Sequence, residues 1–253
     1  ELFYNRGSTE DKMSTKEQLR SLLLPYLNQH GDLRIVGREV FLVPIFHTLR
    51  GIFIDRTSSK GTIKPKWSVA MLFGWKTFSG FGFGYPLPRG WGYIDDPELP
   101  GRLFGEMDRA FDEVLRPAST LDSLFEVQKK STPDWEMRPE DAGLLHAALG
   151  QFEAATSALS LHLERQEQNL KWHLEFVERH TVPNKGPWQR GMALYREWRE
   201  YLDSARELLG LVEAGDRKAV ASLLHRWEAD RVQALKIQQF WEPTPFPFEE
   251  DPI

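Results

Sequence analysis

A series of residues spaced three and four apart runs through the second half of this chain and restricts its fold more than any other feature. These residues, at alternating steps of four and three, are Phe152, Thr156, Leu159, Leu163, Gln166, Leu170, His173 and Val177. Side chains at this spacing lie on one side of an α-helix. We therefore predict helical structure over Pro139–His180, interrupted at Gly150.

Two more helices are predicted after this one. Residues Pro187–Glu213 carry a second series at the same spacing, and Asp216–Ile237 bury Val220, Leu223, Leu224 and Trp227 on one side. Short connections between helices make consecutive helices antiparallel neighbours. The sequence therefore predicts an antiparallel helical bundle in the C-terminal half.

The first half has a different pattern. Residues 33–85 contain short β-branched and aromatic segments, several of which alternate with a period of two, separated by turn residues. Connections of hairpin length favour an antiparallel sheet of four or five strands. One helix is predicted before the sheet, at Ser14–Asn28, and two after it, at Pro97–Leu115 and Ser119–Lys129. The predicted fold class is α+β, a helix-flanked antiparallel sheet followed by the helical bundle.

The predicted domain boundaries follow these changes of pattern. Met13 is interpreted as the native start, which makes residues 1–12 an added segment. The α+β domain is assigned to residues 13–130, the linker (STPDWEMR) to 131–138 and the helical domain to 139–241. The proline-rich, acidic tail at 242–253 (EPTPFPFEEDPI) is expected to be extended and not helical, because prolines interrupt helices.

Composition narrows the possible functions. The chain has no cysteine, which excludes disulfides, thiol catalysis and thiolate metal sites and fits a reducing cytoplasm, where we expect the protein to work. The longest apolar runs, such as Val40–Phe46, are too short to cross a bilayer, so no membrane partner is expected.

Positive charge is concentrated in the predicted sheet. Residues 34–76 hold eight basic groups and two acidic ones, a net charge of +6 within a chain of net charge −5. Arg50, Arg56, Lys64 and Lys66 are spaced to share faces of neighbouring strands. Such a surface favours an acidic protein partner, or a nucleic acid whose bases stack on aromatic rings. It can equally pair with the acidic helical region of the same chain.

The stretch GFGFGY alternates glycine with aromatic residues. Strand geometry places Gly80, Gly82 and Gly84 on one face and the rings on the other. Glycine within a strand is usually found where another backbone or a ligand approaches closely. The glycine face is therefore expected to be covered by the chain's own loop or tail, or by a partner.

No common catalytic motif is present. The G-x-S-x-G and Walker A patterns are missing, and the histidines of the long helix are spaced too far apart to hold one metal. No metal and no cofactor are predicted, and the catalytic residues of any enzyme remain unknown. An enzymatic alternative would use a site between the two domains, with Tyr93, Asp95, Asp96, His47 and Arg50.

The leading prediction is a non-enzymatic, cytoplasmic protein-interaction module, an adaptor or an immunity- or inhibitor-like binder. The fold class is common among small bacterial binding and immunity proteins, which is an analogy of fold alone. The partner is expected to be another protein, with nucleic acid as the alternative, and the chain to be a monomer or a homodimer. The predicted partner-binding residues are Arg50, Arg56, Lys64, Lys66, Gly80, Gly82, Gly84, Trp91, Trp241, Phe246 and Phe248.

Overall fold

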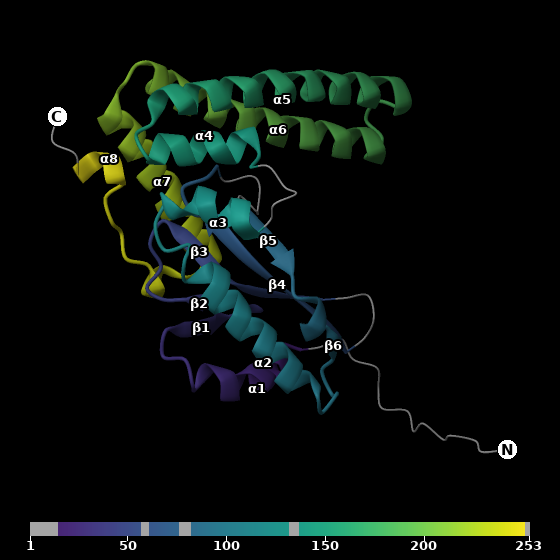
Figure 1. Ribbon diagram of the computed structural model, residues 1–253. Helices are drawn as coiled ribbons and strands as arrows, with labels where there is room; N and C mark the ends of the chain where they lie inside the picture. Colours follow the sequence, from purple (N-terminus) through teal and green to yellow (C-terminus); the bar gives the residue numbers. More distant parts are fainter. Residues whose placement is uncertain (1–14, 57–60, 76–81, 132–136, 251–253) are drawn as a thin grey trace. The chain divides into compact units, whose positions relative to one another are not determined.

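The structure is a computed structural model that describes residues 15–56, 61–75, 82–131 and 137–250 (Figure 1). It confirms the predicted α+β class, with an antiparallel sheet in the N-terminal half and helices after it. The strands are β1 (Leu33–Val36), β2 (Glu39–Leu42), β3 (Thr48–Arg56), β4 (Thr62–Met71), β5 (Gly82–Pro86) and β6 (Gly92–Tyr93). The helices are α1 (Lys16–Leu27), α2 (Leu99–Ala110), α3 (Ser123–Ser131), α4 (Pro139–Ala148), α5 (Phe152–His180), α6 (Gly186–Glu213), α7 (Arg217–Leu235) and α8 (Pro247–Glu250). Three short helical turns, η1 (Pro88–Gly90), η2 (Phe111–Leu115) and η3 (Gln238–Phe240), complete the order.

The described residues divide into two compact units. Unit 1 takes its residues from 15–45, 49–69 and 84–119, and unit 2 from 46–48, 70–83 and 120–250. The segment 46–48 therefore belongs with the helices of unit 2, although the chain reaches it between two strands. The predicted start at Met13 and most of the predicted linker lie outside the described residues.

The sheet has the strand order β1-β2-β3-β4-β5, and β6 pairs with β4. The hairpin between β1 and β2 sets Leu33 opposite Leu42, and β2 then pairs with β3 so that Val40 faces Ile52. In β4 the side chains alternate between buried and more exposed positions, as expected for a sheet with one covered face.

Helices α1 and α2 complete unit 1. A capping box between Thr15 and Gln18 starts α1, and the Tyr26 hydroxyl near its end donates to Asp108 on α2 at 2.8 Å. The buried face of α2 carries Leu103 and Met107. These contacts fix α2 within unit 1, which matters because the opposite face of α2 lines the candidate site.

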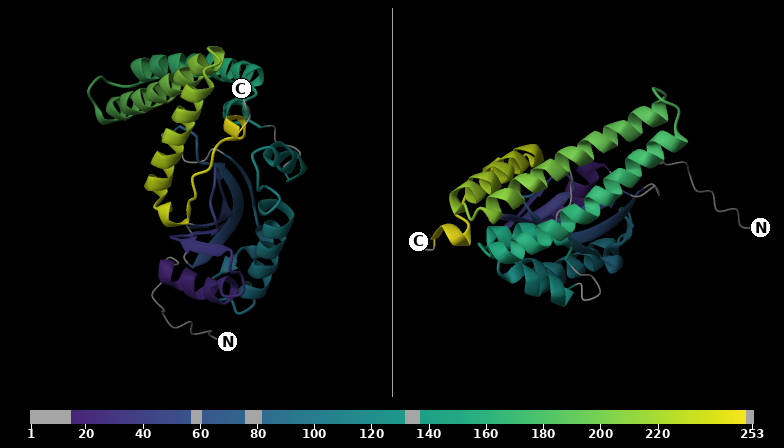
Figure 2. Two further views of the ribbon diagram at one scale, coloured as in Figure 1. Left: turned by 90° about the vertical axis from the view of Figure 1, so that its left-hand side faces the viewer. Right: turned by 90° about the horizontal axis from the view of Figure 1, so that it is seen from above.

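Unit 2 is built on a long helical hairpin, in which α5 and α6 run side by side (Figures 1 and 2). Gly150, at φ +72°, ends α4 and allows the turn into α5, as the sequence predicts. Farther along, a Cβ on Gly191 would lie 2.6 Å from the Val177 side chain, so this side chain of α5 packs directly on the backbone of α6. His173 donates from its ring to the main-chain oxygen of Gly191 at 3.0 Å, one of the polar contacts between the two helices.

The tail differs from its prediction. Pro247–Glu250 form the short helix α8, so the expectation of a wholly non-helical tail is wrong. Proline is tolerated in the first turn of a helix, where its missing N–H would have no partner. The main-chain N–H of Phe246 donates to the carboxylate of Glu249 at 2.7 Å, which stabilises this turn.

Among the described helices, none combines the length and the apolar character needed to cross a membrane.

Candidate functional site

Trp91 stands out in unit 1 as a large ring with 40% of its surface exposed. Its two neighbours are glycines, and both are packed tightly. A Cβ on Gly90 would lie 3.0 Å from Pro65 and 3.1 Å from Leu103, and one on Gly92 would lie 3.0 Å from Leu99. The backbone on each side of Trp91 is therefore packed closely within unit 1, while the indole itself is partly exposed.

The exposed face of α2 lies beside this ring. Its residues Gly101, Arg102, Gly105 and Arg109, with the buried Glu106 between them, line a hollow of about 490 Å³ together with Pro88, Arg89 and Trp91. A Cβ on Gly101 or Gly105 would meet nothing within 4 Å. Each glycine within a helix costs roughly 1 kcal/mol relative to alanine. The chain therefore keeps an open strip of backbone next to an exposed aromatic ring.

Three arginines line the hollow. Arg102 pairs with Asp96 at 2.7 Å, and Arg109 with Glu106 at 2.9 Å. Arg89 is exposed and has no ion-pair partner in the part of the chain that the structure describes. The hydrogen bond from Arg102, with one from the Glu98 backbone, lowers the pKa of Asp96. The hollow thus contains one uncompensated positive charge and two arginines that are already held in place.

Lysines of β4 extend this surface. The Lys64 ammonium lies 5.0 Å from the centre of the Trp91 ring, a cation–π contact. Tyr93 pairs with Thr62 across β6 and β4, so it lies on the same face as Lys64, with 60% of its surface exposed. We call this region the Trp91 surface. Its members are Lys64, Arg89, Trp91, Tyr93, Gly101, Arg102, Gly105, Glu106 and Arg109.

The basic residues predicted to bind a partner are placed differently from one another. Lys66 is exposed on β4, with its ammonium 5.2 Å from the centre of the Phe53 ring. Arg50 is turned inward, and its guanidinium donates to the main-chain oxygen of Leu115 at 3.2 Å. Burial lowers the pKa of Arg50. Arg56 is the last residue of β3.

The glycine strand has a structural explanation at one of its three positions. A Cβ on Gly84 would lie 2.3 Å from the main-chain oxygen of Trp67, so the backbone of β4 is what approaches this residue. Gly82 begins β5, and Gly80 lies outside the described residues.

Predicted residues of the tail are packed within unit 2. Phe246 and Phe248 are both buried. The Trp241 indole donates to the Glu228 carboxylate at 3.2 Å. In this structure their side chains contact their own chain.

A buried series of hydrogen-bonded side chains in unit 2 was not predicted from the sequence. The Tyr201 hydroxyl bonds the Nε2 atom of His162 at 2.7 Å, and the Nδ1 atom of His162 faces Glu140 at 3.2 Å. Burial, together with the Glu140 charge, raises the pKa of Tyr201, so the hydroxyl donates. Although burial alone would raise it, the hydrogen bond from His162 holds the pKa of Glu140 below its usual value.

Asp141, the residue after Glu140, is buried, and one of its oxygens accepts a hydrogen bond from Arg138 at 2.9 Å. Its other oxygen, Oδ1, has no hydrogen-bond partner. Burial raises the pKa of Asp141 to about 7, against the opposing charge of Arg138. Groups with perturbed pKa values gather here, and they bind one another inside unit 2 rather than lining the hollow beside Trp91 or the one between α6 and α7. We therefore interpret the cluster as structural.

The residues of the enzymatic alternative are found in both units. Tyr93, Asp95, Asp96 and Arg50 belong to unit 1, and His47 belongs to unit 2. Within the described ranges, no group of three or more His, Asp or Glu side chains is arranged to hold a metal ion.

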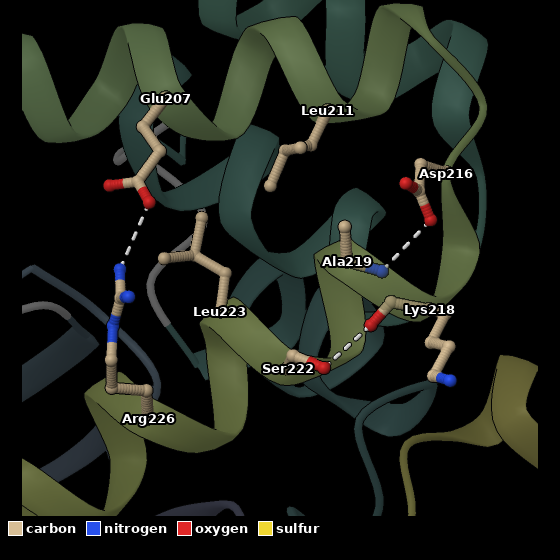
Figure 3. Close-up of a pocket in the computed structure, with 8 residues that line it drawn as sticks. All are labelled: Glu207, Leu211, Asp216, Lys218, Ala219, Ser222, Leu223 and Arg226. Carbon is tan, nitrogen blue, oxygen red and sulfur yellow. Dashed lines mark hydrogen bonds and ion pairs between the residues drawn. The ribbon is translucent and has the colours of Figure 1, made fainter.

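Figure 3 shows a second hollow, in unit 2, between α6 and α7. Its polar side chains already have partners within the hollow: Glu207 pairs with Arg226 at 3.0 Å, and Ser222 donates to the main-chain oxygen of Lys218 at 2.8 Å. It lacks an aromatic ring, and its acidic and basic groups are partly compensated internally. It therefore offers a partner fewer anchoring groups than the Trp91 surface.

Sequence reasoning named Lys64 and Trp91 as partner-binding residues, and both belong to the Trp91 surface. It did not name Arg89 of η1 or the residues of α2, which are Gly101, Arg102, Gly105, Glu106 and Arg109. A usable signal was present, because two glycines four residues apart in a predicted helix share one exposed face and weaken the helix.

Comparisons of this chain with protein-family models, with curated proteins and with solved structures found no match.

Proposed function

We propose that this chain is a non-enzymatic protein-interaction module that binds an acidic segment of a partner protein on the Trp91 surface. The observation that carries the proposal is the exposed Trp91 ring beside an open strip of helix backbone, with basic side chains around it. Tryptophan and arginine are the residues that most often anchor protein interfaces.

The charges favour an acidic partner. Arg89 and Lys64 can each receive a carboxylate without giving up an ion pair seen here. Arg102 and Arg109 are already oriented by Asp96 and Glu106, so less side-chain freedom is lost when they bind. The strip at Gly101 and Gly105 lets an extended segment approach the helix backbone.

The proposal is tested by affinity capture from a lysate of the source organism, treated with nuclease. Three baits are compared: the wild-type chain, the Trp91→Ala variant and the Arg89→Glu variant. The matched controls are Trp172→Ala, at an exposed ring of α5, and Lys16→Glu, at an exposed lysine of α1. We expect a protein that the wild type and both controls capture and that both Trp91-surface variants lose. The same captured proteins with all five baits would contradict the proposal.

Nucleic acid is a second candidate, favoured by the lysines and rings on one face of β4 and β6. Lys64, Lys66 and Tyr93 share that face, an arrangement suited to following phosphates and stacking bases. Fluorescence anisotropy with a single-stranded oligonucleotide of about 12 nucleotides tests it. Binding that weakens steeply with salt and is lost in Lys66→Glu would favour nucleic acid, whereas absence of binding at low salt would remove it.

A further inference from the structure

The last described residues of the chain dock on unit 2 through two phenylalanines. The Phe246 ring is fully buried and stacks on the His47 ring at 4.2 Å, with Phe73 and His225 at 5.3 and 4.7 Å. Phe248, two residues on, packs against Gly150 and lies 5.9 Å from the Phe152 ring. A Cβ on Gly150 would lie 2.5 Å from Phe248, so the glycine leaves the space that this ring fills.

Polar side chains of unit 2 bind the backbone of this segment. His47 Nε2 lies 3.2 Å from the main-chain oxygen of Pro245 and 3.2 Å from the Thr244 hydroxyl. Arg217 donates to the main-chain oxygen of Phe248 at 2.6 Å. Because these donors are side chains of unit 2, they would bind the same carbonyls of any peptide in this position.

Carboxylates complete the contact. His225 on α7 bonds Glu249 at 2.8 Å, and its other nitrogen faces the buried Glu228 at 3.7 Å. The segment thus offers unit 2 two aromatic anchors, main-chain carbonyls and a carboxylate, on a backbone that its prolines make less flexible. Anchors of these kinds are features by which proteins recognise peptide segments.

We propose that unit 2 carries a binding groove for a proline-rich acidic peptide with two phenylalanines two residues apart, and that residues 244–249 of this chain, which end in the helical turn α8, are its displaceable occupant. The groove is formed by His47, Phe73, Gly150, Phe152, Arg217 and His225. This inference is independent of the Trp91 surface, which belongs to unit 1.

Protonation of His225 contributes to binding. The titratable groups that face its ring are Glu228 of its own helix, Glu249 of α8 and His47, whose ring centre is 6.4 Å away. Hydrogen bonding to Glu228, against the opposing effect of burial, and to Glu249 raises the pKa of His225. Glu228 stays with the groove, whereas Glu249 belongs to the peptide, so the peptide further favours the protonated ring. This contribution to binding is lost as the pH rises through the raised pKa of His225. Peptide binding is therefore expected to weaken as the solution becomes alkaline.

The test uses the full chain with Phe246→Ala and Phe248→Ala, which frees the groove without changing the residues that form it. The probe is a fluorescent synthetic peptide of residues 242–250, EPTPFPFEE, and the control is the same peptide with both phenylalanines replaced by alanine. The double variant should bind the probe roughly tenfold or more tightly than the wild type, whose tethered tail competes at high effective concentration. The control peptide should not bind.

The pH dependence gives a second measurement. From about pH 6 to about pH 9 the affinity of the double variant should fall, and adding His225→Gln should remove most of that fall. A folded double variant that fails to bind the probe would overturn the groove. A pH dependence unchanged by His225→Gln would overturn the part assigned to His225.

Hydrogen exchange of the unmodified chain keeps the proposal testable if the double variant does not fold. Amides of residues 246–250 should exchange through a local opening, faster than the amides of α7. If both segments exchange only through global unfolding, the tail is part of the core and is not a displaceable ligand.

Discussion

At the scale of single residues, glycines shape the backbone around Trp91. Gly90 and Gly92, on either side of Trp91, are packed closely against neighbouring side chains of unit 1. Gly101 and Gly105 leave open space on the helix beside the ring. The same residue type therefore has two opposite effects within one site. Alanine substitutions separate these effects. The added Cβ would meet neighbouring atoms at Gly90 or Gly92 and nothing within 4 Å at Gly101 or Gly105.

Gly105→Ala is expected to raise the free energy of unfolding by about 0.5–1 kcal/mol, since alanine favours the helix and its methyl group meets nothing. The same methyl group narrows the strip beside Trp91, so capture of the partner should fall. Gly90→Ala is the matched comparison and should lack this gain in stability, because its Cβ would lie only 3.0 Å from Pro65 and 3.1 Å from Leu103, which must move to make room. Urea unfolding measures both. Full partner capture by Gly105→Ala would show that the strip is not in contact.

Asp141 makes the stability of the protein depend on pH. Its pKa is raised to about 7 in the folded chain, above the unfolded value of 3.8. The folded state therefore retains a proton that the unfolded state loses, and the free energy of unfolding should fall, by the order of a few kcal/mol, as the pH rises between these values. Asp141→Asn should flatten this slope in urea titrations from about pH 4 to about pH 8. An unchanged slope in that variant would assign the dependence to other groups.

At the scale of elements, the α5–α6 hairpin depends on one close approach. Gly191 allows α6 to lie against Val177 of α5 and to accept a hydrogen bond from His173. On the outside of α5, Trp172 stacks on Phe176 with ring centres 5.5 Å apart, and 65% of the Trp172 surface is exposed. The inner face of the hairpin is thus tightly packed, while its outer face carries exposed rings.

Gly191→Ala should separate the two helices locally and lower the free energy of unfolding by about 1–2 kcal/mol, because its Cβ would lie 2.6 Å from Val177. Gly210→Ala lies on the same helix, with nothing within 4 Å of its Cβ, and should raise stability by about 0.5–1 kcal/mol. Hydrogen exchange should show the loss in Gly191→Ala concentrated near residues 173–195. Equal effects of the two substitutions would contradict this account of the hairpin.

At the scale of the whole molecule, charge is distributed unevenly. The chain has a net charge of −5, yet basic groups gather around Trp91. A partner that is itself acidic is repelled by the chain as a whole and attracted by this one surface. Binding of such a partner would therefore depend on attraction at short range. Salt screens the interaction between exposed charges over a Debye length, which is about 10 Å at 0.1 M.

Raising the salt concentration from about 0.05 M to about 0.5 M should weaken binding of the acidic partner, since the attraction is electrostatic. Arg89→Glu should weaken binding at low salt far more than Lys16→Glu, although both variants carry the same net charge. Titrations of the purified partner against the three proteins measure this. Equal losses in the two variants would mean that net charge, and not the Trp91 surface, governs binding.

Much of the fold could be predicted because secondary structure depends on local patterns. The spacing of Leu159, Leu163 and Leu170 is enough to predict α5, and Gly150 and Asp216 mark the ends of helices where the structure has them. The antiparallel sheet followed from alternation and short connections in the same way. The proline-rich tail was predicted less well, because Pro247 occupies the one helical position that tolerates it.

The candidate site was predicted only in part. Trp75 and Trp91 are the same type of residue, yet Trp75 is fully buried and Trp91 is exposed. The bond between Tyr201 and His162 joins residues 39 positions apart, and the stacking of Phe246 on His47 joins residues still more distant. The sequence alone thus determined the fold class and most of the helices, since hydrophobic period and capping act within a few residues. Only the tertiary structure decided which rings are covered and which charges meet, because burial depends on faces brought together from distant parts of the chain.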